Sequence, residues 1–151
     1  MGETAKITFR KMTAEDADAV AEIEMKTFSR PWKREDFLNE ANRDFAEYVV
    51  GEIDGKSIAY AGAWISFNEA EVMNVAAEEN FRGQGIGKKL FAELIGLCKI
   101  RGATAITLEV RASNSAAIKL YENFGLKSVG RRKNYYDSPT EDALIMWNTK
   151  I

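Results

Sequence analysis

The 151-residue sequence contains no histidine, a single cysteine and two prolines. Without an imidazole, Ser-His-Asp and Cys-His catalysis are excluded, and the presence of only one thiol argues against a zinc site. A general base must therefore be a carboxylate, a lysine, a tyrosine or water. Cys98 cannot form an internal disulfide, which fits a reducing compartment, and its apolar neighbours favour a packing role.

Long hydrophobic runs are also missing. The longest mainly apolar run, residues 58–67, includes Gly62 and Ser66 and is too short to cross a bilayer. No signal peptide is recognisable, and a myristoylation motif fails because Lys6 stands where it needs Ser or Thr. The net charge of −2 gives no general reason to expect nucleic-acid binding. We expect a cytoplasmic protein with neither a membrane nor a nucleic-acid partner.

The composition is that of a globular chain, with 46% hydrophobic and 29% charged residues, and its length suits one domain over residues 1–151. Alternation of apolar residues with period two predicts strands, and a period near 3.6 predicts helices. Strands are expected at residues 7–10, 45–53, 57–67, 71–77, 104–110, 126–131 and 143–148, and helices at 14–28, 33–41, 86–100 and 115–123. This order predicts a single-domain α/β fold in which helices flank a mixed central β-sheet.

Turn and cap residues support these boundaries. Thr13 is a good N-cap for the first helix, and Pro31 ends it because proline disfavours a helical conformation in the residue before it. Asp54 and Gly55 predict a tight hairpin turn. Gly102 and Gly125 are expected to end the two later helices, as glycine does at C-terminal caps.

A glycine-rich loop, Arg82-Gly83-Gln84-Gly85-Ile86-Gly87-Lys88, lies between an expected strand and an expected helix. Its glycines let backbone amides approach an anion, and the helix start adds free N–H groups and the positive end of the dipole. The sequence therefore predicts a phosphate or pyrophosphate site here. The alternative is a glycine-rich turn that binds nothing.

Two common nucleotide motifs do not fit this loop. A dinucleotide fingerprint would need glycine at Lys88, and a Walker A loop would need Ser or Thr at Lys89. The R-G-x-G-I-G pattern after a strand instead resembles the pyrophosphate loop of the GNAT acetyltransferase superfamily, R/Q-x-x-G-x-G/A. Residues 74–77 and 120–126 are also similar to that superfamily, and residues 28–32, 108–114 and 132–136 resemble its bacterial RimI group.

The resemblance covers nearly the whole chain and implies a GNAT fold and acetyl-CoA as co-substrate, with no metal. RimI enzymes acetylate the N-terminal alanine of ribosomal protein S18, so the resemblance also implies this protein substrate. The cofactor-binding residues that it implies are Val75, Ala76, Ala77, Arg82, Gly83, Gln84, Gly85, Ile86, Gly87, Lys88 and Asn114. The alanine and valine positions would act through their backbone, and Asn114 is equally a plausible helix cap.

The resemblance assigns Glu109 as general base and Tyr121 as the general acid that protonates the coenzyme A sulfur. By themselves, these residues would indicate a solvent-facing strand carboxylate and a core tyrosine. Tyr135 and Tyr136, expected in a loop between the last two strands, match tyrosines that line the peptide groove of N-terminal acetyltransferases. Without the resemblance, the pair would indicate rim packing.

Glu141 and Asp142 are expected to be solvated charges, with a secondary possibility that one attracts a basic residue in the substrate tail. An α-amine, with a pKa of about 8, is neutral at pH 7 far more often than a lysine at about 10.4. Three alternatives stay open: an acetyltransferase for other N-termini, one for lysine or a small amine, and a non-catalytic acetyl-CoA sensor. A sensor needs only the loop, so the Glu109–Tyr121 pair speaks against it.

Overall fold

The computed structural model describes residues 6–151, in which seven strands and four α-helices follow the expected order. The strands are β1 (Thr8–Lys11), β2 (Ala46–Ile53), β3 (Lys56–Ser66), β4 (Glu69–Ala77), β5 (Ala105–Arg111), β6 (Lys127–Tyr136) and β7 (Glu141–Asn148). The helices are α1 (Ala17–Thr27), α2 (Arg34–Ala41), α3 (Ile86–Ile100) and α4 (Ser115–Glu122), with single 3-10 turns at Ala14–Asp16 and Glu79–Phe81. None of these helices is long and apolar enough to cross a membrane.

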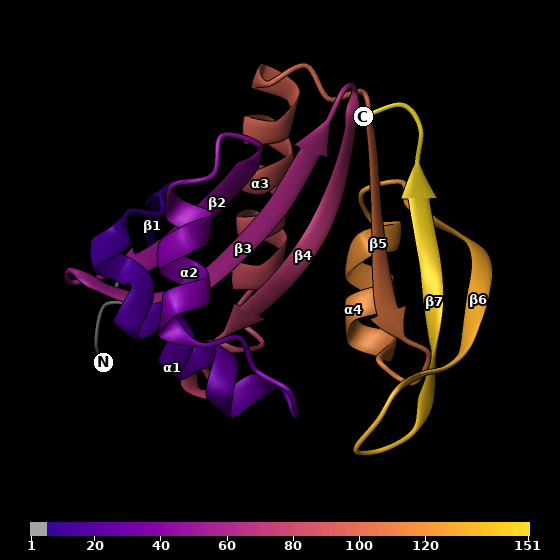
Figure 1. Cartoon of the computed structure of the whole chain (residues 1–151), viewed down its shortest axis with the longest axis horizontal. Coiled ribbons are helices and arrows are strands. Elements are labelled where there is room, and N and C mark those ends of the chain that lie inside the picture. Colours follow the sequence, from indigo (N-terminus) through magenta and orange to yellow (C-terminus); the bar gives the residue numbers. More distant parts are fainter. Residues whose placement is uncertain (1–5) are drawn as a thin grey trace.

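All seven strands belong to one mixed sheet, in the order β1-β2-β3-β4-β5-β7-β6. Every neighbouring pair is antiparallel except β4 and β5, which run parallel and are connected through α3. Helices α1 and α2 cover one face of the sheet, and α3 and α4 cover the other (Figure 1). The predicted α/β fold with a mixed central sheet is confirmed.

Each face of the sheet has its own hydrophobic core. Behind the sheet, Leu90 and Phe91 of α3 are fully buried in one cluster with Ile58 of β3 and Tyr121 of α4. On the other face, Val20 of α1 and Phe37 of α2 pack on the central strands. Burying a side chain of this size contributes about 1.5–3 kcal/mol to the free energy of unfolding, so both helix layers are held firmly.

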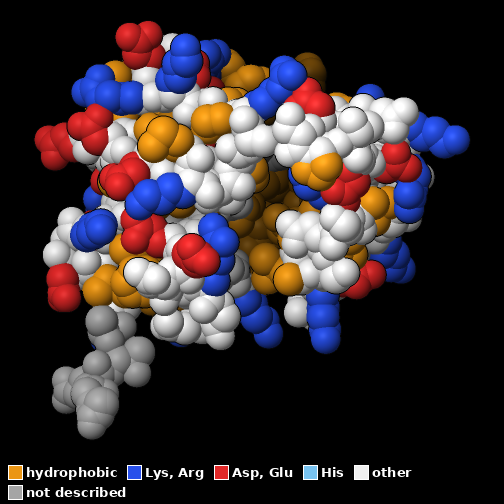
Figure 2. All heavy atoms as spheres, turned by 90° about the horizontal axis from the view of Figure 1, so that it is seen from below, with side chains coloured by type: hydrophobic (Ala, Val, Ile, Leu, Met, Phe, Trp, Pro, Cys, Tyr) orange, Lys and Arg blue, Asp and Glu red, His pale blue; other side chains and the backbone are white. Residues whose placement is uncertain are grey.

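The sheet is interrupted between β4 and β5, and this interruption positions the site. Their ladder joins residues 69–71 to residues 105–107, after which the strands diverge (Figure 1). Because Gly62 pairs with Asn74 and Ala63 with Val72, Met73 is an extra residue that makes a β-bulge in β4. Seen from the diverging ends, the molecule has a deep hollow lined by hydrophobic side chains (Figure 2).

The predicted turns are confirmed at several places. Asp54 and Gly55 form the two-residue β2–β3 turn with φ of 51° and 79°, the positive values that such a turn requires. Helix α3 has the predicted bounds, and Gly102, with φ of 95°, directly follows its last turn. Gly125, with φ of 83°, follows α4 in the same way.

Two expected boundaries are wrong. The first helix begins with a 3-10 turn, and α1 starts only at Ala17, because the Asp16 carboxylate turns inward to accept the Thr13 N–H and pairs with Arg10. Strand β6 continues to Tyr136 rather than ending near residue 131. Its ladder with β7 resumes beyond an irregularity, with Tyr136 opposite Glu141, so the tyrosine pair lies on a strand and not in a loop.

Candidate active site

The glycine-rich loop has the geometry of an anion site. Gly83 and Gly85 have φ of 80° and 76°, and a Cβ at either position would meet no atom within 4 Å. Gly85 is the N-cap of α3, where no side chain caps the helix. The first-turn N–H groups therefore remain available to a bound phosphate, at the positive end of the helix dipole.

Arg82 supports the loop rather than projecting freely from it. Its Nε donates to the Ala77 carbonyl at 3.0 Å, and one terminal nitrogen donates to the Thr27 hydroxyl at 3.4 Å. Arg82 thus joins the loop to the end of β4 and to the end of α1. Lys88, in the first turn of α3, is exposed and adds positive charge beside the free N–H groups.

The edge of β4 that faces β5 carries unpaired backbone groups. The Glu78 N–H donates to the Ile58 carbonyl of β3, and alternation along an antiparallel ladder then turns Ala76 toward β3 as well. Val75 and Ala77 turn their N–H and C=O groups the other way, beyond the end of the β4–β5 ladder, where the Ala77 carbonyl accepts from the Arg82 Nε. Val75 and the Ala77 N–H therefore face the opening, and Ala76 does not.

Glu109 lies on β5 beside this opening. Leu108 and Val110 point into the core behind the sheet, so Glu109 points to the opposite face. Its Oε2 atom is buried and accepts no hydrogen bond from residues 6–151, although the Arg132 Nε is 3.1 Å away. The guanidinium is therefore close enough for ionic attraction, although its N–H is not aligned for a hydrogen bond.

Tyr121 approaches the opening from the other side of the sheet. It lies on α4 and is buried against Phe91, with ring centroids 5.0 Å apart. Burial, with a smaller contribution from Tyr136, raises its pKa to about 12. Burial also raises the pKa of Tyr136 to about 12, with Tyr135 and Glu109 adding to the effect. Tyr136 is therefore electrostatically coupled to both Glu109 and Tyr121.

Two arginines lie over the rings of the tyrosine pair, Tyr135 and Tyr136. The rings of Tyr135 and Tyr136 meet edge to face at 5.0 Å. Arg111 stacks on Tyr136 with its guanidinium 4.5 Å from the ring centroid, and Arg132 lies 5.9 Å from that of Tyr135. Tyr135 is 53% exposed, so its ring presents a face to solvent next to the Glu109–Arg132 pair.

Two loops come together across the sheet at this end of the molecule. Arg30, between α1 and α2, forms a 2.6 Å ion pair with Asp137, between β6 and β7. Arg111 donates to the Asp137 and Pro139 carbonyls, each at 3.0 Å, and so ties the second loop to β5. The chain segments 28–33 and 137–140 are therefore linked although they lie far apart in the sequence.

Glu24 is a functional candidate that the sequence interpretation missed. This carboxylate is buried and accepts hydrogen bonds from the Trp32 backbone at 3.0 Å, from Asn74 at 3.3 Å and from the Tyr60 hydroxyl. It thereby fixes the loop after α1 to β3 and to the bulged part of β4. A signal was present, because Glu24 stands at helical spacing, four and seven residues on, from the apolar residues Val20 and Ala17.

Other predicted residues have intramolecular roles. Asn114 caps α4 by accepting from the Ala117 N–H at 3.2 Å, as expected. Glu141 pairs with Arg111 and accepts from the Ser113 N–H at 2.6 Å, and Asp142 pairs with Arg131. Glu141 and Asp142, expected to be solvated charges, are partly exposed, and each also forms an ion pair. In residues 6–151 no group of three acidic or thiol side chains could hold a metal ion.

The elements around the hollow are those that acyl transfer from a phosphate-bearing carrier requires: an anion loop, an unpaired strand edge, a carboxylate and a phenol. The sequence profile of the Acetyltransferase (GNAT) family matches residues 17–126, and the chain belongs to this family of acyltransferase enzymes. The resemblance to the GNAT superfamily, the fold that it implied and the predicted enzyme class are confirmed.

Two relatives are similar to this chain over nearly its whole length. The chain is 43% identical over 145 residues to a Bacillus subtilis (strain 168) protein, provisionally named a [ribosomal protein bS18]-alanine N-acetyltransferase, covering 95% of this chain and 96% of that one. It is 33% identical over 141 residues to the [ribosomal protein bS18]-alanine N-acetyltransferase of Escherichia coli (strain K12), covering 92% and 95%.

Solved structures agree with this comparison. The crystal structure of the ribosomal-protein-S18-alanine N-acetyltransferase from Escherichia coli superposes with a TM-score of 0.88 at 32% identity, covering 97% of this chain and 96% of that one. The predicted likeness to the RimI group is thus confirmed. Arabidopsis thaliana NAA60, solved in complex with acetyl-CoA, has the same fold at 20% identity, with a TM-score of 0.84 over 95% and 99% of the chains.

Proposed function

We propose that this protein transfers the acetyl group of acetyl-CoA to the α-amine of a protein N-terminus, and that its substrate is the N-terminal alanine of ribosomal protein bS18. The observation that carries the proposal is the position of Glu109, whose buried Oε2 lies beside the opening between β4 and β5 and 3.1 Å from the Arg132 Nε. The names of the two curated relatives support this substrate. A ribosomal substrate would place the activity in the cytoplasm.

The residues fit acetyl-CoA, which supplies an acetyl group activated as a thioester. The open concavity at Gly83 and Gly85 and the uncapped start of α3 would bind the pyrophosphate. Because Val75 and the Ala77 N–H face the opening, they would hydrogen-bond the pantetheine arm and the acetyl oxygen. Asn114, exposed at the start of α4, can contact the carrier while it caps the helix.

Glu109 and Tyr121 would move the protons. The neutral amine nitrogen bonds to the acetyl carbon, and Glu109 Oε2 takes the proton that this nitrogen then loses, directly or through one water. The carbon–sulfur bond breaks, and the Tyr121 hydroxyl gives its proton to the departing thiolate. An amide and a free thiol result, and solvent returns the proton from Glu109 to Tyr121.

The surroundings favour a peptide N-terminus as the acceptor. Tyr135 and Tyr136 would contact the first substrate residues with ring faces and hydroxyls, and the Arg30–Asp137 pair limits the space above them. An α-amine with a pKa of about 8 is also much easier to deprotonate than a lysine at about 10.4. A base of ordinary strength such as a carboxylate is therefore sufficient.

The proposal is tested by mass spectrometry of a substrate panel incubated with acetyl-CoA. The panel contains an alanine-initiated peptide, the same peptide with a blocked N-terminus and an internal lysine, and spermidine. We expect acetylation of the free alanine N-terminus and little transfer to the other two. Efficient transfer to spermidine or to internal lysine, with an unreactive alanine peptide, would refute it, and binding of acetyl-CoA without any turnover would indicate a sensor.

A further inference from the structure

Four carboxylate side chains are buried among residues 6–151, and they differ in how their charge is balanced. Three of them form an ion pair with an arginine: Asp16–Arg10, Glu40–Arg43 and Glu47–Arg101. Glu24, on α1, is only 3% exposed and forms no ion pair with any described residue. A buried carboxylate without a counter-ion lowers stability unless hydrogen bonds offset its desolvation. The role of Glu24 is therefore to be sought in the groups that it binds.

The Glu24 carboxylate accepts hydrogen bonds from donors on three segments of the chain. Its Oε2 accepts from the Trp32 backbone N–H at 3.0 Å, in the α1–α2 loop, residues 28–33. Its Oε1 accepts from the Asn74 amide of β4 at 3.3 Å and from the Tyr60 hydroxyl of β3. Burial, and then the charge of Glu24, raise the pKa of Tyr60, so this hydroxyl stays protonated. Because an ionised carboxylate only accepts, it satisfies all three donors at once.

These contacts lie beside the part of β4 that faces the opening. Asn74 directly precedes Val75, whose backbone groups face the opening, and Tyr60 pairs with Ala76, which directly follows it. Both strand contacts of Glu24 therefore flank the position where β4 has left its ladder with β5. The third contact is with the α1–α2 loop, so Glu24 fixes this loop relative to the free edge of β4.

The α1–α2 loop borders the proposed peptide site. Its Arg30 pairs with Asp137, which directly follows Tyr136 in the chain. The side chains of this pair are 80% and 47% exposed, and exposed pairs contribute little by themselves. A hydrogen bond to a buried charged group contributes more. The Trp32–Glu24 bond is therefore the stronger of these two polar contacts that hold the loop.

We propose that Glu24 is a positioning residue, whose carboxylate holds the α1–α2 loop against β4 and so sets the affinity for the peptide acceptor. This inference rests on the proposed function, since it assumes a peptide bound beside the loop. Glu24 does not touch the reacting atoms and moves no proton, so its loss should act on the KM of the peptide more than on kcat. Acetyl-CoA affinity should stay nearly unchanged, because no hydrogen bond of this carboxylate involves the glycine-rich loop.

The test separates positioning from stability with Glu24→Met, Tyr60→Phe and the double variant. Methionine matches the length of glutamate but offers no carboxylate oxygen. Glu24→Met should lower Tm by about 5–10 °C, because buried donors lose their acceptor. It should also raise the KM of an alanine-initiated peptide about fivefold to 20-fold at saturating acetyl-CoA, because the loop is released.

The double variant should recover much of the Tm, since it removes the fully buried Tyr60 hydroxyl that Glu24→Met leaves without an acceptor. Its peptide KM should remain raised, because the Trp32 N–H still lacks its partner. Tyr60→Phe alone should have a normal KM, since Glu24 Oε2 still accepts from Trp32. Glu24→Gln keeps one acceptor oxygen for this N–H and should restore most of the peptide affinity.

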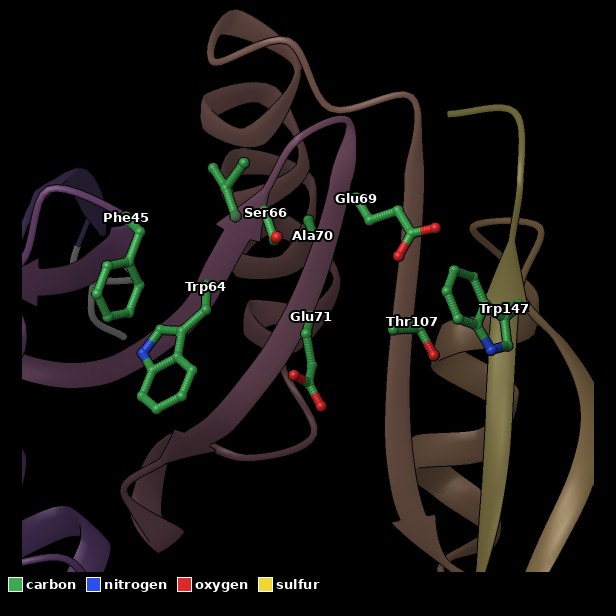
Figure 3. A pocket seen from close by; sticks show the side chains of 9 residues that line it. Phe45, Trp64, Ser66, Glu69, Ala70, Glu71, Thr107 and Trp147 are labelled. Carbon is green, nitrogen blue, oxygen red and sulfur yellow. The ribbon is translucent and has the colours of Figure 1, made fainter.

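Glu40→Met is the matched control, because Glu40 is also buried on this face and accepts from the Trp64 indole N–H at 2.6 Å. Trp64 lines a cavity of about 550 Å³ with Glu71 and Thr107, where β4 and β5 are still paired (Figure 3). The control should therefore lower Tm and leave the peptide KM unchanged.

Three outcomes would overturn the inference while the proposed function stands. They are an unchanged KM in Glu24→Met, a KM that returns to normal together with Tm in the double variant, and an equal rise of KM in Glu40→Met. If Glu24→Met does not fold, the double variant and Glu24→Gln carry the same comparison with the wild-type protein. If the wild-type protein acetylates no alanine-initiated peptide, the proposed function falls, and this inference falls with it.

Discussion

In the proposed mechanism Glu109 and Tyr121 divide the proton chemistry, and their surroundings differ. Glu109 is 22% exposed, and its buried Oε2 lies 3.1 Å from the Arg132 Nε. Tyr121 is enclosed by Phe91 and the core behind the sheet, which raises its pKa to about 12 and keeps it protonated.

Glu109→Gln and Tyr121→Phe should each lower kcat by about 10²-fold to 10⁴-fold, the usual contribution of general acid–base groups. Acetyl-CoA affinity should stay nearly unchanged, because neither substitution alters the glycine loop. Steady-state kinetics and calorimetry provide the two values. Near-normal kcat in both variants, at saturating substrates, would contradict the assigned roles.

Tyr121 also makes a prediction about pH. Its raised pKa means that the protonated, proton-donating form persists until the pH approaches about 12. The kcat of the wild-type protein should therefore show no alkaline decrease below about pH 10.5, where an unshifted tyrosine of pKa about 10 would already be largely ionised. A decrease in kcat centred near pH 10 that is absent in Tyr121→Phe would show that burial does not shift this group.

Among the elements, α3 and its preceding loop combine two roles. The apolar side of α3 builds the core behind the sheet, whereas its uncapped first turn faces the hollow. Gly85 joins the loop to α3, because its left-handed conformation lets the chain enter the helix without a side chain in the anion site.

Gly85→Glu should lower acetyl-CoA affinity about 10-fold to 100-fold, since a carboxylate would stand where a phosphate must approach. Glutamate at positive φ also costs about 1–2 kcal/mol of unfolding free energy, so a strain control is needed. Gly55→Glu supplies it: Gly55 has φ of 79° against 76° for Gly85, and both have open space around a Cβ. Calorimetry should show normal affinity for Gly55→Glu, and equal affinity in both variants would refute the site.

At the scale of the whole molecule, the hollow is produced by the divergence of β4 and β5 and is bordered by loops that lie far apart in sequence. Glu24 holds residues 28–33 against the central strands, and Arg111 holds residues 137–140 against β5. The Arg30–Asp137 pair joins these loops, so the two halves of the chain are linked beside the proposed peptide site.

Arg30→Ala and Asp137→Ala should each raise the KM for an alanine-initiated peptide about twofold to fivefold, a modest effect because both side chains are exposed. The double variant should be no worse than either single one, as expected for one shared interaction. Acetyl-CoA affinity should not change. Arg34→Ala, which breaks the exposed Arg34–Asp18 pair, is the control, and additive losses in the double variant would contradict the link.

The amino-acid sequence by itself determined the local features of this protein. The bounds of α3, the Asp54–Gly55 turn, the Asn114 cap and the loop before α3 depend on neighbouring residues, and periodicity and turn chemistry were sufficient to predict them. The family could also be recognised, because its loop pattern is contiguous. The absence of histidine restricts the general base to a few residue types, a limit that composition alone imposes.

Only the tertiary structure decided which groups meet. The length of β6 depends on pairing with β7, the burial of Glu24 on contacts with β3 and β4, and the free edge of Val75 and Ala77 on where the β4–β5 ladder ends. The cross-strand pairing that places Trp64, Glu71, Thr107 and Trp147 side by side involves four strands, and the hydrophobic periodicity of the sequence does not predict the order of these strands in the sheet. These features could not be predicted because strand order and register arise from packing between segments distant in sequence, and local propensity carries no information about them.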